Sequence, residues 1–247
     1  MPINVVGSYL SPYVRKVLVC LRLKGLSYTI DPIVPFYGND EFSRISPLRR
    51  IPVLIDEHVT LSDSTVICEY LNEQYPFPPL LPASNASRAQ SRWYEEFADS
   101  RMGEVLIWHL YNQTIIRRFV WGEAPDEQVL DNALGVEIPS LLDYLEGQLP
   151  SAGFLFGALS MADVSIASFF RNASFATFEI DSARWPRTSA YVGQVLGHPA
   201  FQQLVPFEQL CLRTPIAKHR AVLLEAGAPV CPTTFGSASP RRGTLSI

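Results

Sequence analysis

A short proline-rich segment divides this chain into two parts with different hydrophobic patterns. Residues 76–84, with the sequence PFPPLLPAS, hold four prolines in nine positions. Proline fixes its own backbone angle and cannot donate a backbone hydrogen bond, so this segment is stiff and cannot form a helix. We therefore predict a linker here, joining two structural units.

The part before the linker has the pattern of a small mixed sheet. Short runs rich in β-branched residues predict strands at 3–6, 28–34, 53–55 and 59–61. One helix is predicted between the first two strands and another after the fourth. The order β-α-β-β-α, with a hairpin joining the last two strands, favours a mixed sheet with helices packed on it.

The first helix has clear start and stop signals. Ser11 is a favoured N-cap residue, Pro12 suits the first helical position, and Gly25 is typical of the residue that ends a helix. Apolar residues follow at helical spacing between these signals, which predicts that Arg15 and Lys16 lie on the outer face.

Helical patterns dominate after the linker. The pattern Ser-x-x-Gln at 87–90 and the pattern Ser-x-x-Asp at 160–163 each predict a capping box. A long helix is predicted to start near Asp126, with a kink or break at Pro139. The chain is thus expected to contain a sheet domain at 1–78, a linker at 79–86, an all-helical domain at 87–222 and an extended tail at 223–247.

Composition argues against several classes of function. The 247 residues carry a net charge of −4, without a basic field that would attract nucleic acid. No apolar run reaches the roughly 20 residues that cross a bilayer. The four cysteines and four histidines show no metal-ligand spacing. We therefore expect a cytoplasmic protein without a metal, which binds neither nucleic acid nor membrane.

Three features at strand–helix junctions could carry chemistry, and each also has a purely structural interpretation. Ser11 lies at the positive end of a helix dipole, where it could stabilise a thiolate or only cap the helix. If the Ile51–Pro52 bond is cis, the backbone of Ile51 faces outward and can pair with a ligand's peptide; if trans, it is an ordinary strand start. Asp63 and Ser64 could bind the ammonium and carboxylate of an α-amino acid, or serve only as caps.

The order of these features is more informative than any one of them. Next to Pro52 stand Arg49 and Arg50, two cations that could hold a carboxylate. Together the features match an extended tripeptide with an amino-acid head, a thiol in the middle and a carboxylate tail. That describes glutathione.

With these residues in place, the sequence resembles the cytosolic glutathione S-transferase family, over about residues 3–210. SPYVRKVLVCLRLKGLSY resembles the first helix of the family, and SPLRRIPVLIDEHVTLSDSTVICEYLNEQYP resembles its cis-proline strand, hairpin and following helix. FLFGALSMADVSIASFF resembles the capping-box helix of its second domain. The first motif is similar to that of serine-type, tau- or omega-like members of bacterial type. The resemblance implies a thioredoxin-like domain followed by an all-α domain, usually as a homodimer.

The resemblance also implies roles for individual residues. Ser11 occupies the catalytic position, with Tyr9 in reserve. Ser46 replaces the usual asparagine of the turn before the cis-proline. Arg50 would hold the glycine carboxylate of glutathione. Ile51 with Pro52 would pair with its cysteinyl backbone, and Asp63 with Ser64 would hold its γ-glutamyl group.

The reaction implied is attack of a glutathione thiolate on a small hydrophobic electrophile, a detoxification reaction. Glutathione-dependent isomerisation or dehalogenation at the same site is an alternative. So is a non-catalytic protein-interaction module similar to stringent starvation protein. A homodimer is expected to pair residues 64–75 with residues 87–102 of the second copy. The electrophile is expected between the domains, against Tyr13, Phe36, Trp108, Tyr111 and Phe169.

Overall fold

Four short strands form one mixed sheet in the order β2-β1-β3-β4. In this computed structural model, which describes residues 3–242, β1 (Ile3–Val6) runs parallel to β2 (Tyr28–Asp31). On its other side β1 pairs antiparallel with β3 (Val53–Ile55), which continues antiparallel to β4 (Thr60–Ser62). The predicted thioredoxin-like arrangement is confirmed, although β2 ends three residues earlier than expected.

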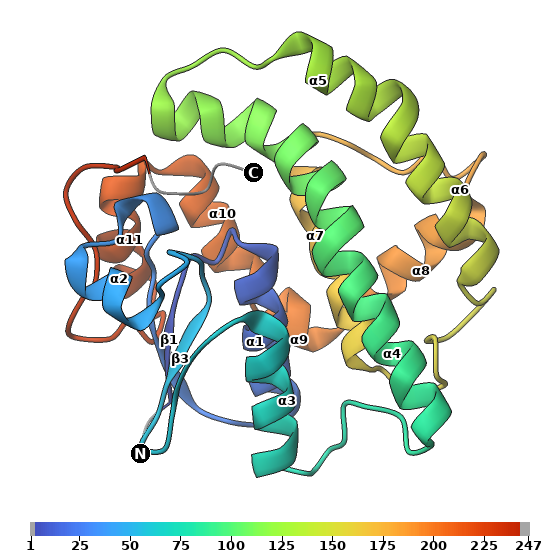
Figure 1. Ribbon diagram of the computed structural model, residues 1–247, viewed down its shortest axis with the longest axis horizontal. Coiled ribbons are helices and arrows are strands. Elements are labelled where there is room, and N and C mark those ends of the chain that lie inside the picture. The colour runs from blue at the N-terminus through green and yellow to red at the C-terminus, as the bar shows by residue number, and fades with distance from the viewer. Residues whose placement is uncertain (1–2, 243–247) are drawn as a thin grey trace. The chain divides into compact units, whose positions relative to one another are not determined.

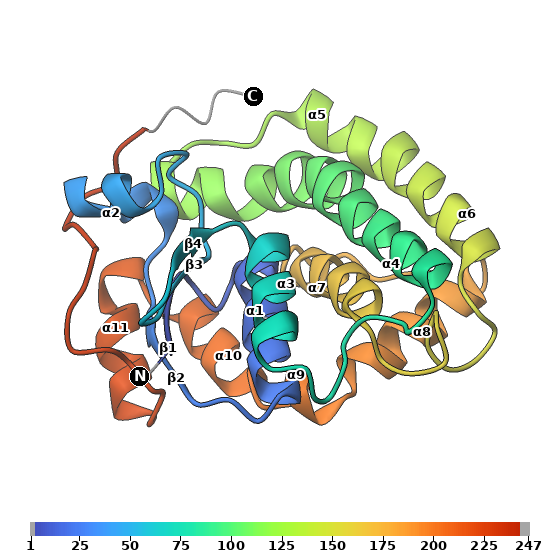
Figure 2. The same ribbon diagram turned by 60° about the horizontal axis from the view of Figure 1, so that its bottom comes forward.

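Helices lie on both sides of this sheet (Figures 1 and 2). One side carries α1 (Pro12–Leu23) and α3 (Ser64–Gln74), and the other carries α2 (Asp40–Ile45) and α11 (His219–Glu225). A 3₁₀ turn, η1 (Pro35–Tyr37), precedes α2. The sequence pattern did not predict η1 or α2, because the two elements are too short for a helical periodicity to show.

Two charged residues of α1 are buried, which corrects the prediction that they lie outside. Arg15 keeps 1% of its surface exposed and donates from Nε to Glu208 Oε1 at 2.6 Å. Lys16 is fully buried and donates from Nζ to Thr65 Oγ1 at 3.2 Å. A buried charge must be paired or hydrogen-bonded, and these partners lie far away in sequence, where helical periodicity cannot find them.

The C-terminal part of the chain belongs to the first structural unit. Residues up to 78 and from 203 onward form one unit, and Pro79–Gln202 form the other. Glu208 lies on α10 (Val205–Arg213), where Phe207 also packs its ring 5.1 Å from that of Tyr9. This division differs from the expected helical domain at 87–222. The first unit also contains η4 (Ile216–Lys218) and α11, so the expected tail at 223–247 begins inside a helix.

The second unit is all-helical, as predicted. Its helices are α4 (Asn85–Phe97), η2 (Ala98–Trp121), α5 (Glu127–Asn132), η3 (Ala133–Glu137), α6 (Ile138–Gln148), α7 (Met161–Phe175), α8 (Pro186–Leu196) and α9 (Pro199–Gln202). In η2 and η3 the backbone follows a π-helical pattern. The central helix α7 is buried on nearly every side and packs against α4, η2 and α8.

The sequence predicted some of the helix starts in this unit correctly and others not. Ser84 rather than Ser87 is the N-cap of α4, because Ser84 Oγ accepts from the Ser87 backbone N–H at 3.0 Å. Asp126 caps α5 as expected. The break expected at Pro139 appears as η3, directly before this proline. The box at Ser160 is confirmed, with Ser160 N–H donating to Asp163 Oδ2 at 2.8 Å.

Candidate functional site

Ser11 lies in the turn between β1 and α1, and its side chain caps the helix. Its Oγ accepts from the Val14 backbone N–H at 3.3 Å, at the long end of the range for a hydrogen bond. The residue is half-buried. A serine hydroxyl has one donor and two acceptor positions, so this oxygen can accept from the helix and still donate to a ligand. The capping and catalytic interpretations of Ser11 are therefore compatible.

Glycine at position 7 lets the Ser11 turn approach the cis-proline segment. Gly7 has φ of +151°, and a Cβ there would lie 2.5 Å from Val14 Cγ2 and 3.2 Å from Ile51 Cβ. Only a residue without a side chain fits this space. The start of α1 and the backbone near Ile51 thus lie on either side of Gly7.

Tyr9, the reserve catalytic residue, packs in the core. It is 1% exposed, and its ring lies against Phe207 of α10. Burial raises the pKa of the Tyr9 phenol far above its ordinary value, and the neighbouring Tyr28 raises it further. A ligand would have to displace core packing to reach the Tyr9 hydroxyl, so the geometry favours Ser11.

The predicted cis peptide bond between Ile51 and Pro52 is confirmed. Ile51 precedes β3, and within residues 3–242 its backbone N–H and C=O form no hydrogen bond. Ser46 fixes the preceding turn: its hydroxyl donates to Arg50 O at 2.8 Å and accepts from Arg50 N–H at 2.9 Å. Ser46 therefore provides both a donor and an acceptor to this turn. A peptide can pair with the free backbone groups of Ile51 as an added strand.

The two neighbouring arginines differ in their contacts. Arg49 has φ of +50°, a left-handed conformation that costs a non-glycine residue roughly 1–2 kcal/mol. Its guanidinium donates to Gly38 O at 2.8 Å and to Ser43 Oγ, and lies 5.7 Å from the centre of the Phe42 ring. Arg50 is exposed, and its guanidinium has no partner among the described residues. Arg50 is thus the arginine that is available for a carboxylate.

Asp63 and Ser64 mark the start of α3, as predicted. Asp63 is the N-cap, and its Oδ1 accepts from the backbone N–H groups of Thr65 at 2.9 Å and Val66 at 3.0 Å. The Asp63 side chain is exposed, while Ser64 is buried at the first position of the helix. The sequence missed Lys16, whose ammonium group reaches Thr65 in the same helical turn. This buried cation adds to the positive end of α3, where an anion is stabilised.

The residues proposed to contact the electrophile differ in exposure. Tyr13 and Phe36 in the first unit, and Trp108 in the second, are half-buried. Tyr111 is 6% exposed, with its ring 6.4 Å from that of Phe175. Phe169 is completely buried on α7, so it is a core residue and not a wall of an open pocket.

Comparison with known proteins follows the same division of the chain. Residues 5–79 match the model of the glutathione S-transferase N-terminal domain, and residues 127–193 match that of the C-terminal domain. The two matches together cover more than half of the chain. The chain belongs to the glutathione S-transferase family.

The known proteins that the chain resembles differ in how much of their length matches it. A maleylacetoacetate isomerase from Pseudomonas aeruginosa is 29% identical over 209 residues, covering 81% of this chain and 94% of the relative. A stringent starvation protein A homolog from Haemophilus ducreyi is 36% identical, but over 80 residues, covering 32% of this chain and 37% of the relative. A glutathione S-transferase structure from Rhodospirillum rubrum F11 superposes with a TM-score of 0.75 at 27% identity, covering 82% of this chain and 91% of that one.

Residues 3–242 contain neither a candidate metal site nor a candidate membrane-spanning helix. No group of three or more His, Cys, Asp or Glu side chains is arranged to hold a metal ion. No helix in this range is long and apolar enough to cross a membrane.

Proposed function

We propose that this protein is a serine-type glutathione transferase, in which Ser11 stabilises the thiolate of glutathione. The observation that supports this most directly is the backbone of Ile51, which forms no hydrogen bond within residues 3–242 and lies next to the turn that carries Ser11. A thiol with a pKa near 8.5 is only a few per cent ionised at pH 7. A hydrogen bond from Ser11, together with the α1 dipole, lowers that pKa and raises the fraction of thiolate.

The rest of glutathione is held by groups that do not react. The Ile51 backbone pairs with the cysteinyl residue, and the exposed guanidinium of Arg50 binds the glycine carboxylate. Asp63 accepts from the ammonium of the γ-glutamyl group. The carboxylate of the γ-glutamyl group faces Ser64 and the start of α3. The thiol proton passes to solvent, and the thiolate sulfur forms a bond to an electrophilic carbon of a small hydrophobic molecule. The bond from that carbon to its leaving group, such as a halide, breaks, and the leaving group departs with the electron pair. Tyr13, Phe36, Trp108 and Tyr111 remain predictions for the contacts to that molecule.

An isomerase is the second candidate, supported by the match over 94% of the P. aeruginosa maleylacetoacetate isomerase. In that reaction the thiolate adds to a conjugated carbon–carbon double bond, the new single bond rotates, and elimination returns free glutathione. The two reactions differ in one quantity, because a transferase consumes one thiol for each product and an isomerase consumes none. Titration of free thiol during turnover, with an aryl halide and with a cis-configured conjugated dicarboxylate as the two substrates, separates them.

A binding module without catalysis is the third candidate, suggested by the match with the stringent starvation protein A homolog. Retention on immobilised glutathione tests it, with elution by free glutathione. Arg50→Ala serves as the matched control, because it removes the proposed carboxylate contact from an exposed position. Failure of the wild-type protein to bind glutathione would refute both enzyme proposals.

We also propose that the protein is a cytoplasmic homodimer in which α3 of one copy packs against α4 and the start of η2 of the other. Val66 on α3 and Trp93 on α4 are large apolar side chains that are 50% and 54% exposed. Such exposed apolar surface is expected at an interface. Sedimentation at micromolar concentration should give the mass of a dimer, and Trp93→Glu should shift it toward the monomer.

A further inference from the structure

The chain after α11 runs along the outer edge of the sheet as an extended segment, residues 229–241, which we call the strap. Its first part pairs with β2: Ile30 N–H donates to Pro229 O at 2.8 Å, and Cys231 N–H donates to Ile30 O at 2.9 Å. The strap therefore covers the edge of β2 that β1 leaves unpaired. The free edge of a strand can pair with a strand from another molecule. In this protein the strap occupies the free edge of β2.

A buried carboxylate fixes this first part. Asp31, at the end of β2, has no exposed surface and accepts from Phe235 N–H at 2.7 Å and from Arg220 Nη1 at 3.1 Å. Arg220 also donates to Cys231 O. Burial raises the pKa of Asp31, and its hydrogen bonds with the strap and Arg220 oppose that increase. One carboxylate thus joins β2, α11 and the strap.

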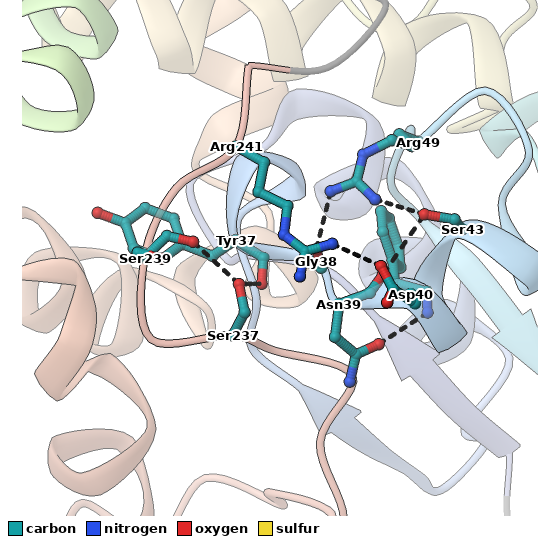
Figure 3. Close-up of polar contacts among 10 residues, drawn as sticks. Tyr37, Gly38, Asn39, Asp40, Ser43, Arg49, Ser237, Ser239 and Arg241 are labelled. Atoms are coloured by element: carbon teal, nitrogen blue, oxygen red, sulfur yellow. Dashed lines mark hydrogen bonds and ion pairs between the residues drawn. The ribbon is translucent and has the colours of Figure 1, made fainter.

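The second part of the strap holds the segment that leads into α2 (Figure 3). Asn39 N–H donates to Phe235 O at 2.8 Å, Ser237 N–H donates to Tyr37 O at 2.6 Å, and Arg241 N–H donates to Phe36 O at 2.8 Å. Arg241 also forms an ion pair with Asp40 at 2.5 Å, which lowers the pKa of Asp40. The residues from η1 to the start of α2 are therefore bonded to the strap at successive positions.

Gly38 connects these contacts to the turn before the cis-proline. It forms an antiparallel bridge with Gly236 of the strap, while its carbonyl accepts from Arg49 Nη2 at 2.8 Å. Arg49 needs such contacts, because its left-handed backbone is unfavourable for a residue with a side chain. Arg50 and Ile51 follow directly. The position of the Arg49 side chain thus depends on a segment that the strap holds in place.

We propose that the strap is a positioning element, which fixes the Arg49 turn so that Arg50 and Ile51 meet the carboxylate end and the peptide backbone of glutathione. This inference rests on the proposed function for its ligand. When the strap is removed, the turn occupies its binding geometry for only a fraction of the time. The apparent dissociation constant then rises by the inverse of that fraction, while the chemistry at the sulfur is unchanged.

A pair of shortened chains tests the inference. The chain ending at Phe235 loses the contacts of Ser237 and Arg241 but keeps the Asp31 anchor. The control chain ending at Arg242 keeps every contact described above. Ser237→Pro in the 247-residue chain removes the donor to Tyr37 without shortening the chain, and so replaces the first variant if that one does not fold.

Two measurements are made on each protein. Hydrogen–deuterium exchange without ligand reports the protection of residues 37–51, and calorimetry reports the dissociation constant of glutathione. The chain ending at Phe235 should show roughly tenfold faster exchange in this range and a roughly tenfold higher dissociation constant, with kcat unchanged at saturating glutathione. The control chain should match the 247-residue chain in both.

The effect must also depend on Arg50. In an Arg50→Ala background, shortening to Phe235 should raise the dissociation constant less than in the wild type, because only the Ile51 backbone remains to be positioned. An equal rise in both backgrounds would overturn the part of the inference that concerns Arg50. Unchanged exchange or unchanged affinity in the chain ending at Phe235 would overturn the whole inference. Absence of glutathione binding by the wild type refutes the proposed function, and the exchange experiment then still decides whether the strap holds the turn.

Discussion

Replacing Ser11 by alanine separates its two roles, because they act on different quantities. As a cap, Ser11 accepts one long hydrogen bond, from Val14 N–H at 3.3 Å. Its loss should lower the free energy of unfolding by about 0.5–1 kcal/mol, the low end for an N-cap. As a donor to a thiolate, Ser11 makes a charge-assisted hydrogen bond worth roughly 1.5–3 kcal/mol. Since one pKa unit corresponds to about 1.4 kcal/mol, Ser11→Ala should raise the thiol pKa of bound glutathione by about one to two units.

The rate should follow the fraction of thiolate. For a bound thiol whose pKa is near the assay pH of about 6.5, an increase of one to two units lowers the ionised fraction about fivefold to fiftyfold. Turnover with a generic aryl halide should fall by the same factor. The difference should shrink as the pH rises above both pKa values, because the thiol is then ionised in the wild type and in Ser11→Ala alike.

Ultraviolet titration of bound thiolate, together with thermal melting, decides between the roles. A lower melting temperature with an unchanged thiol pKa in Ser11→Ala would refute the catalytic role and leave only the cap. Tyr9→Phe is the control and should leave the thiol pKa unchanged, because Tyr9 is buried against α10. A shift in Tyr9→Phe alone would transfer the role to Tyr9. Ser11→Cys should favour disulfide exchange with glutathione, since a thiol at a helix N-terminus ionises readily.

Further predictions concern binding and stability. Arg50→Ala and Asp63→Asn should each raise the Michaelis constant for glutathione more than they lower kcat, because they hold atoms remote from the sulfur; an unchanged constant in steady-state kinetics would contradict their assignment. Asp163→Ala should cost about 3–5 kcal/mol in urea unfolding, because the hydroxyl of Tyr191, at 2.6 Å, and three further donors lose their acceptor. Glu146 accepts from the amides that start α8; burial raises its pKa, but these hydrogen bonds hold it below the ordinary value. The stabilisation that Glu146 provides is therefore complete above about pH 4.3 and is lost as the pH falls through the folded pKa. In Glu146→Gln, the melting temperature should depend less on pH in this window.

Local signals predicted much of the first unit. Start and stop residues gave the bounds of α1 closely, because Ser11, Pro12 and Gly25 act on their own stretch of backbone. The cis bond before Pro52 was also predicted, from its place before a buried strand and from the family resemblance. These features depend on few residues that are adjacent in sequence.

The features that the sequence did not predict depend on distant contacts. Arg15 was placed outside because helical spacing cannot reveal an acceptor on Glu208, 193 residues away. The sequence predicted an extended tail but not its contacts, because its Pro, Gly, Ser and Thr residues have no periodicity, whereas its partners are Asp31 and the edge of β2, far away in sequence. Phe169 was assigned to a pocket on residue type alone, and the burial of α7 on nearly every side could not be known from its own sequence.

The division of the chain also has a consequence for its synthesis. Pro79–Gln202 form a unit that is complete in a single stretch, whereas the sheet unit needs both the first 78 residues and those from 203 onward. At roughly 5–20 residues per second, a ribosome needs about 1–4 seconds to extend the chain from residue 202 to residue 220. Until these residues are made, Arg15 has no Glu208 and Asp31 has no Arg220. The helical unit should therefore fold first, although it comes second in the sequence, and a chain that terminates before residue 203 should leave these two buried charges without their partners.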